Sequence, residues 1–293
     1  MTLTISEAIT RISYALRGTD DDAPTFGDDE AIYWLSLLNR KKDELYTDVG
    51  KQWSIIYKNQ APTELGTVAT AGTTALTGTN TYFTDYAVGD KITVDGETVR
   101  TIATITSDTA LTVTVAFSNT ASGKTFTRDT IIATGVQTYS LHRQLLGVSD
   151  QIYVVDTSDN KHYLELVHPQ EINRSVQQVY LSGRDPELLT FSIDIESTDT
   201  MVGGSLVVPG YYMPEDMTAE TDLLPVPDSN WLVMATAAEI AFADVVYEDR
   251  AEALNARAND LWNKMVARNR RGTFGNPRTT PYRLKRIRDT RVR

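Results

Sequence analysis

The sequence contains no cysteine and only three histidines among its 293 residues. The lack of cysteine excludes a disulfide scaffold, thiolate zinc sites, a cysteine nucleophile and iron–sulfur ligation. With only His142, His162 and His168 available, a histidine-rich metal centre is not expected. The fold must therefore be stabilised by a packed hydrophobic core, which a chain of this length can form without disulfide bonds.

A long apolar run is also missing. The longest apolar stretch, residues 231–247, is interrupted by Glu239 and Asp244, and it is too short and too charged to cross a membrane. The N-terminal residues lack a basic segment followed by an apolar one, so no secretory signal peptide is expected. These features favour a protein made and used in a cytoplasm, or in a particle assembled there, with no membrane partner.

Charge is divided sharply along the chain. Ten bases and one acid, Asp289, give residues 268–293 a formal charge of +9, while the other 267 residues carry −20, for −11 overall. Apolar residues at 41% and charged residues at 23% are otherwise those of an ordinary soluble protein with two or three domains. The sequence therefore predicts an acidic body with a strongly basic C-terminal arm.

A first helix is predicted over residues 5–16, where apolar residues recur at helical spacing. Thr4 and Glu7 form a plausible capping box at its start. Residues 17–27 are rich in turn formers and predict a loop. The carboxylates of residues 20–22 resemble calcium ligands, but the alternation and closing glutamate of an EF-hand loop are missing, which favours a solvated loop.

A second helix of about 30 residues, roughly 45 Å long, is predicted to begin at Asp28 or Asp29 and to end before Ala61. Carboxylates suit the positive end of a helix dipole, and the residue before Pro62 resists helical geometry. Its predicted apolar face consists of Ile32, Leu35, Leu38, Leu45, Val49, Trp53 and Ile56.

The composition changes abruptly after this helix. Residues 66–130 contain 20 threonines and recurring glycines. Residues 91–94 and 98–99 flank Asp95-Gly96, a strong hairpin signal, and residues 111–115 alternate as a strand does. The segment predicts a small all-β barrel or sandwich, inserted as a domain over residues 65–129.

Residues 130–228 are also predicted to form β strands, but their sequence pattern differs from that of the threonine-rich segment. They predict a β-sandwich-like region. Pro169 predicts a short helical turn after a strand, since proline is tolerated at the first helical position. The strand candidates are residues 137–141, 151–155, 163–167, 189–193 and 205–208.

A long helix of about 40 residues is predicted after Pro227, with Asp228 or Ser229 as its N-cap and a break near residues 247–250. Glycines and Pro277 end it beyond Arg271. Its predicted buried face consists of Trp231, Met234, Ala238, Ala241, Val245, Leu254, Ala258, Leu261, Trp262 and Met265.

The fold class expected from these elements is α+β. Helices from both ends of the chain are expected to form a helical bundle around a β-sandwich-like middle region that carries an inserted small β-barrel or sandwich. The expected domains are residues 1–64 with 229–271, residues 65–129, residues 130–228, and the basic arm at residues 272–293.

No specific catalytic signature is present. The sequence has no G-x-S-x-G elbow, P-loop, H-E-x-x-H or dinucleotide-binding pattern. His162 and His168 lie on or beside a predicted strand near acidic residues, where a surface or satisfied histidine is the favoured interpretation. Asp194 and Glu196 would share one face of a predicted strand, which suits acid–base work, but a solvated strand face is favoured. We therefore predict no enzyme, no cofactor and no metal.

The order of the predicted elements is a helix, a long helix, a β-sandwich, an alanine-rich long helix and a basic tail. Within it, three blocks of sequence are distinctive: residues 134–141 with 147–155, residues 206–214 through 223–228, and residues 235–244 with 251–268. Together they resemble the head-to-tail adaptor (connector or neck) proteins of tailed bacteriophages, the ring subunits that dock beneath the portal. The alanine-rich helix is the most telling block. The threonine-rich segment resembles small β-modules of phage structural proteins and is additional to the common adaptor plan.

The resemblance implies a structural protein of the virion at the head–tail junction, assembled in the cytoplasm of a bacterial host. Implied partners are the portal protein, a tail or nozzle/terminator protein below, and further copies of the chain in a ring of about twelve. Genomic DNA would pass through the channel without specific binding, and an acidic wall suits that passage because it does not hold phosphate.

Two sets of residues carry these expectations. The helix-packing and ring-interface residues are Leu35, Leu38, Leu45, Trp53, Ala238, Ala241, Leu254 and Trp262. The portal-binding arm is represented by Arg278, Arg283, Lys285, Arg286, Arg288, Arg291 and Arg293. A basic arm suits this role because it complements an acidic portal surface.

Two alternative functions stay open. The arm is also compatible with a nucleic-acid-binding protein, since arginine- and lysine-rich runs commonly contact phosphates, although the acidic body would repel DNA. The β-modules and the Asp194/Glu196 pair are compatible with a carbohydrate-binding or carbohydrate-cleaving tail component.

Overall fold

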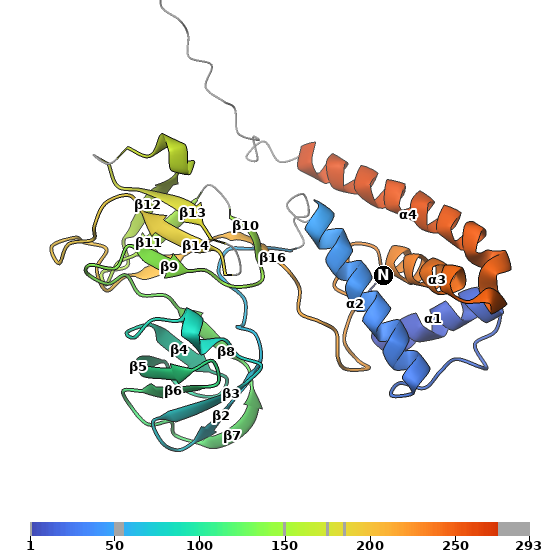
Figure 1. Cartoon of the computed structure of the whole chain (residues 1–293), viewed down its shortest axis with the longest axis horizontal. Helices are drawn as coiled ribbons and strands as arrows, with labels where there is room; N and C mark the ends of the chain where they lie inside the picture. The colour runs from blue at the N-terminus through green and yellow to red at the C-terminus, as the bar shows by residue number, and fades with distance from the viewer. Residues whose placement is uncertain (1, 50–55, 149–150, 174–175, 184–185, 275–293) are drawn as a thin grey trace, which may run out of the picture. The chain divides into compact units, whose positions relative to one another are not determined.

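The computed structural model describes residues 2–49, 56–148, 151–173, 176–183 and 186–274. It confirms a mixed α+β protein with curled, barrel-like sheets. The chain divides into two compact units, residues 1–45 with 216–293 and residues 46–215. The first is called the helical unit and the second the β unit (Figure 1).

Helix α1 (Ile5–Arg17) forms as predicted. Thr4 Oγ1 accepts a hydrogen bond of 3.2 Å from Glu7 N, and Glu7 Oε2 accepts one of 3.0 Å from Thr4 N. This reciprocal pair satisfies two amide groups that the first turn leaves without a helical partner. The buried face holds the five apolar residues that the periodicity indicates, Ile5, Ala8, Ile9, Ile12 and Leu16.

Helix α2 (Asp29–Val49) begins where predicted but does not continue to residue 60. Residues 57–58 form strand β1 (Tyr57–Lys58), which pairs with β16 (Gly210–Tyr212) far along the sequence. Because that pairing satisfies the backbone of residues 57–58, it overrides the local helical pattern. The predicted helix is therefore too long.

The predicted apolar face of α2 is also wrong at its start. Ile32 is 55% exposed, whereas Ala31 and Trp34 are 1% exposed. The true face continues through Leu38 to Lys42, whose side chain is fully buried. Helical spacing from Ala31 selects this face, and the sequence interpretation missed it because it started from Ile32 and left out Trp34 and Lys42.

The long C-terminal helix is two helices. Helix α3 (Ser229–Ala243) starts at the predicted N-cap Asp228. The 3-10 helix η5 (Val245–Tyr247) separates it from α4 (Glu248–Phe274), slightly before the predicted break. Helix α3 packs against both α1 and α4.

No single helix of the described residues is long and apolar enough to span a membrane. Helix α3 and the helical segment after it meet the length and composition criteria only when taken together, and a bend of 113° separates them.

Outside the insert, the β unit contains two sheets. A mixed six-stranded sheet has the order β15-β11-β12-β13-β14-β9, and a three-stranded sheet has the order β1-β16-β10. All five predicted strands are present, and the predicted turn after β12 is the 3-10 helix η4 (Pro169–Glu171). Strands β10, β13, β16 and β1 were not predicted. The strands not yet bounded are β9 (Thr138–Ser140), β10 (Leu145–Val148), β11 (Ile152–Val155), β12 (Lys161–Leu166), β13 (Gln178–Ser182), β14 (Leu188–Phe191) and β15 (Ser205–Val207).

Residues 67–129 alone build a seven-stranded antiparallel sheet with the order β7-β2-β3-β6-β5-β4-β8 (Figure 1). The predicted turn at Asp95-Gly96 is present, with Gly96 at a φ of 83°. The second strand of the hairpin begins at Arg100 and not at residues 98–99, so Lys91 lies opposite Thr101. The core is apolar and contains Val68, Leu76, Phe83, Ile92, Val94, Ile102, Leu111, Val113, Phe117 and Phe126. The strands are β2 (Thr67–Ala71), β3 (Ala75–Thr79), β4 (Lys91–Val94), β5 (Arg100–Ser107), β6 (Ala110–Val113), β7 (Thr120–Lys124) and β8 (Phe126–Asp129).

Candidate functional site

A buried polar cluster lies where the chain enters and leaves the insert. Glu64 precedes β2, Arg128 belongs to β8, and His142 follows β9. Tyr86 and Asp90, from the insert, complete the set. We call these five residues the junction cluster. Each has a buried or nearly buried side chain, so each needs a polar partner inside the protein.

Arg128 connects the parts of the cluster. Its Nε lies 3.3 Å from Glu64 Oε1, its Nη1 donates to Asp85 O at 3.1 Å, and its Nη2 donates to Ser140 O at 3.0 Å. The guanidinium also lies 4.4 Å from the centre of the Tyr86 ring. All of its faces are therefore engaged, and the side chain ties the insert to β9.

His142 is held by hydrogen bonds at both of its ring nitrogens. Its Nδ1 accepts a hydrogen bond of 3.2 Å from Gln144 N, so Nε2 carries the proton and donates to Thr63 O at 3.0 Å. Nε2 also lies 3.7 Å from Glu64 Oε2. Because both ring nitrogens have partners, this histidine positions the chain before β2 and has no free nitrogen for proton transfer.

Burial raises the pKa of two groups of the cluster, Asp90 and Tyr86. Asp90 accepts hydrogen bonds from Ile131 N at 2.9 Å and Ala87 N at 3.0 Å. Burial raises the pKa of Asp90, while the positive charge of Arg128 opposes that rise. Burial, followed by the negative charge of Glu64, raises the pKa of Tyr86 well above its usual range. The phenol therefore stays protonated at neutral pH.

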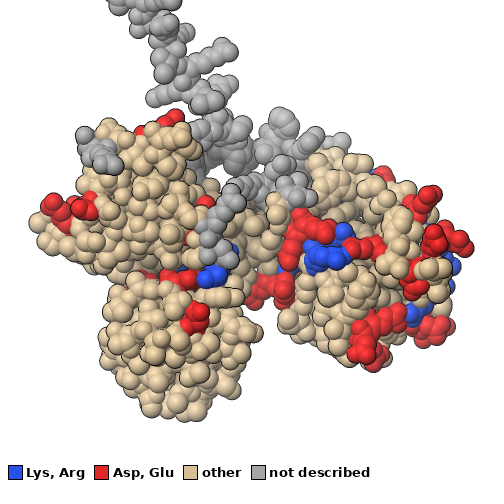
Figure 2. Space-filling view, viewed as in Figure 1, with Lys and Arg blue, Asp and Glu red and all other residues tan. Residues whose placement is uncertain are grey.

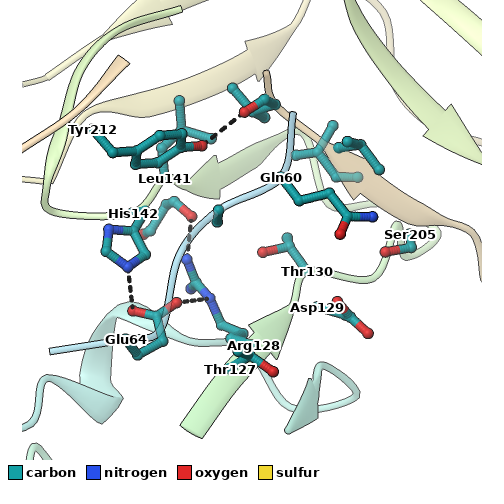
Figure 3. A pocket seen from close by; sticks show the side chains of 15 residues that line it. Gln60, Glu64, Thr127, Arg128, Asp129, Thr130, Leu141, His142, Ser205 and Tyr212 are labelled. Carbon is teal, nitrogen blue, oxygen red and sulfur yellow. Dashed lines mark hydrogen bonds and ion pairs between the residues drawn. The ribbon is translucent and has the colours of Figure 1, made fainter. Parts of the chain in front are cut away.

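A pocket of about 160 Å³ opens beside the cluster (Figure 3). Its charged walls, Glu64 and Arg128, are bonded to each other, and the Tyr212 hydroxyl donates to Val208 O at 2.7 Å. Gln60, Thr130 and Ser205 also line the pocket and are labelled in Figure 3. The ion pair between Glu64 and Arg128 in the wall of this pocket stabilises the junction, because each buried charge has an opposite partner.

The carboxylates considered for acid–base work do not lie on a strand. Strand β14 (Leu188–Phe191) ends before Asp194, so Asp194 and Glu196 occupy an exposed loop on either side of the buried Ile195. Asp194 accepts a hydrogen bond from the Gln137 amide. The predicted strand was too long at this point, because the chain bends after Phe191, whose amide donates to Gln137 O.

The two other histidines have local partners. His162 Nε2 lies 2.8 Å from Asp156 Oδ2, across the β11–β12 hairpin. The hydrogen bond to His162 is the largest cause that holds the pKa of Asp156 well below its usual range, and the amide of Asn160 adds to it. His168 Nδ1 accepts from Gln170 N at 3.3 Å and caps η4.

No group of three or more histidine, aspartate or glutamate side chains in the described part of the chain is arranged to hold a metal ion. Residues 20–22 lie in an exposed loop between α1 and α2. There the backbone carbonyl of Asp22 accepts a hydrogen bond from Arg17.

The expected helix-packing residues lie mostly inside the helical unit. Leu38, Leu45, Ala238, Ala241 and Leu254 are buried there, so they pack within the chain and present no surface to a neighbouring copy. Leu35 and Trp262 are half-buried, and Trp262 stacks with Trp231 at 5.3 Å between ring centres. Trp53 and the arm residues 278–293 lie outside the described residues.

Large apolar side chains are exposed instead at the bend between α3 and α4. Phe242 is 58% exposed, Val245 85% and Val246 78%. Val245 was predicted to be buried, and that prediction is wrong because the helix breaks at Asp244 and turns the valine outward. We call Phe242, Val245 and Val246 the apolar tip.

Sequence analysis missed the junction cluster. Its members come from positions 64, 86, 90, 128 and 142, which no motif connects. The available signal was positional, because Glu64 and Arg128 border the segment whose composition marks it as an insert.

Comparison with known proteins gives no relative: no family model matches the chain, and no curated protein matches it significantly.

Proposed function

We propose that the protein is a structural head-to-tail adaptor of a tailed bacteriophage, with no catalytic role. In this proposal the helices from both ends of the chain form a bundle, and copies stand side by side in a ring that docks on the portal and continues the DNA channel toward the tail. The resemblance of residues 134–268 to that family motivates the proposal.

The observation that carries the proposal is the packing of helices from opposite ends of the sequence. Helix α1 packs against α3, and Lys41 Nζ of α2 lies 3.1 Å from Glu239 Oε2 of α3. Asn39 of α2 also bonds to Met217, which belongs to the C-terminal part of the chain. The two ends therefore lie in one compact unit, with the β unit between them in sequence, and this arrangement supports the proposed subunit shaft.

The basic arm supplies the proposed contact with the portal. Residues 268–293 carry +9 on a chain whose remaining residues carry −20. Figure 2 shows acidic side chains outnumbering basic ones on the visible face of the helical unit. A cationic segment on an acidic body favours a negatively charged partner, and electrostatic attraction speeds such an encounter.

The test uses heads that carry the portal but lack this protein. We expect the full chain to convert them to tail-competent particles and a chain ending at Arg271 to fail. A matched control replaces the arginines of the arm by lysine, which preserves charge and should retain activity. Normal assembly with the shortened chain would contradict the proposal.

Nucleic-acid binding is the second candidate, favoured by the arginine content of the arm. If DNA were the target, the isolated protein would bind it with a log–log salt slope of about −0.9 per phosphate contacted. No binding at about 0.1 M salt would leave the portal as the favoured partner.

A further inference from the structure

The apolar tip is unusual for a helix bend. Three large apolar side chains within five residues are mostly exposed to water, whereas single exposed apolar residues are common and need no explanation. Breaking the helix does not require them. Asp244 already ends α3, and its Oδ1 accepts from Val246 N at 2.9 Å, a role for which polar neighbours would serve equally well.

Acidic residues lie beside the tip. Asp244, Glu248 and Asp249 are exposed beside it along the chain. Arg17 donates to Tyr247 Oη at 3.0 Å and also to the Asp22 carbonyl. That shared arginine links the backbone of Asp22 to Tyr247. The three exposed carboxylates outnumber the one exposed base in the same stretch, Arg250, and form an acidic rim beside the apolar centre. A fitting partner therefore carries apolar residues among bases.

The C-terminal arm of this chain has that composition. Its apolar residues Tyr282, Leu284, Ile287 and Val292 alternate or interleave with bases. The bases are Arg283, Lys285, Arg286, Arg288, Arg291 and Arg293.

The arm cannot place all four of its apolar residues on the tip of its own molecule. Helix α4 has 27 residues and separates the tip from the arm by about 40 Å at 1.5 Å per residue. A fully extended chain covers at most about 3.4 Å per residue, so roughly 12 residues are needed to return. Those 12 residues include Tyr282 and Leu284, so only the last residues of the arm, with Ile287 and Val292, could reach the tip of the same molecule. A second copy can offer the tip all four.

We propose that the apolar tip and its acidic rim bind the C-terminal arm of a second copy of this chain. The contact joins two different surfaces, so it repeats from copy to copy and closes into a ring when the rotation allows. This inference deepens the proposed function, because the ring that the contact would close is the ring of that proposal. The contact is expected in the free protein, where the arm has no portal to bind.

The first test is the mass of the full chain in solution at about 0.05 M and 0.5 M salt. We expect self-association at low salt that weakens at high salt, because the Debye length shortens from about 14 Å to about 4 Å. Val245→Asp with Val246→Asp in the tip should weaken association on the order of tenfold or more. Lys264→Asp, exposed on α4 away from the tip, is the matched single-site control and should have a much smaller effect.

A complementation experiment distinguishes loss of the contact between tip and arm from misfolding of a variant. The tip variant keeps a native arm, and an arm variant, Leu284→Asp with Arg286→Glu, keeps a native tip. Each alone should be monomeric, and their mixture should form a one-to-one dimer that does not grow. A monomeric full chain at low salt, or a mixture that stays monomeric, would overturn the inference.

Portal binding separates this inference from the proposed function. The tip variant retains its arm, so it should still bind portal rings. If the chain binds the portal through its arm but never self-associates through the tip, only the present inference fails.

Discussion

Asn39 and Met217 exchange two hydrogen bonds of 3.0 Å, one from the side-chain amide to the Met217 carbonyl and one from Met217 N to the side-chain carbonyl. A helix side chain thus pairs with a distant peptide group as a neighbouring strand would. This pairing fastens α2 to the chain segment that leads into α3.

Replacing Asn39 by alanine should lower the free energy of unfolding by about 2–3 kcal/mol, because two hydrogen bonds are lost and a part-buried peptide group is left without partners. Ser36→Ala on the exposed side of the same helix is the control and should cost less than about 0.5 kcal/mol. Tryptophan fluorescence during urea unfolding measures both, since Trp34, Trp231 and Trp262 lie in the helical unit. Equal effects would contradict the assigned role of the pairing.

Removal of the Arg128 charge should destabilise the β unit strongly. Arg128→Met leaves Glu64 buried without its cationic partner, which should cost about 3–5 kcal/mol. Lys124→Met removes an exposed ion pair with Asp95, 3.0 Å long, and should cost less than about 1 kcal/mol. No tryptophan lies between residues 54 and 230, so the loss is measured from the sheet signal in circular dichroism.

The same pair of variants has an internal check. Glu64→Gln added to Arg128→Met should recover part of the lost stability, because it neutralises the stranded carboxylate. If the double variant loses more stability than the two single variants lose when their losses are added, Glu64 contributes through packing and not through charge.

Two glycines with the same backbone twist should respond differently to substitution. Gly66 has a φ of 84° and Gly96 a φ of 83°. A Cβ on Gly66 would lie 2.4 Å from the Thr79 carbonyl oxygen, whereas one on Gly96 meets nothing within 4 Å. Gly96→Ala should cost about 1–2 kcal/mol from backbone strain alone. Gly66→Ala should cost clearly more, measured by thermal unfolding of both variants.

Acid should weaken the β11–β12 hairpin through Asp156. A carboxyl group whose pKa is lower in the folded than in the unfolded state adds stability above its ordinary pKa, and the gain is lost as pH falls toward the folded pKa. The pKa of Asp156 lies below its ordinary value of 3.8, so the loss should occur below about pH 4. Asp156→Asn should remove this part of the acid dependence, and His162→Gln should reduce it. Unfolding curves from pH 2 to 7 that are parallel for all three proteins would argue against the pairing.

Local signals predicted much of the fold. The capping box at Thr4, the N-cap at Asp228 and the alternating strands each depend on neighbours a few residues away, and all are present in the structure. The sequence could not reveal the end of α2, because residues 57–58 are decided by pairing with residues 210–211. Sheet order is likewise set by contacts between distant strands.

The buried polar residues and the exposed apolar residues were harder to predict for the same reason. Buried polar residues such as Lys42 and Glu64 resemble surface residues in a sequence, since only their partners reveal the burial. Val245 resembles a core residue until the bend at Asp244 turns it outward. The apolar tip therefore became visible only when the break between α3 and α4 was located to the residue.

The most direct test of the adaptor proposal is the mass of the complex formed between this chain and isolated portal rings. The account predicts that many copies bind each portal ring and that a chain ending at Arg271 binds none, while its circular dichroism spectrum keeps the native helical and sheet signals. If the shortened chain binds the portal as well as the full chain, or if the full chain does not bind at all, the account is wrong.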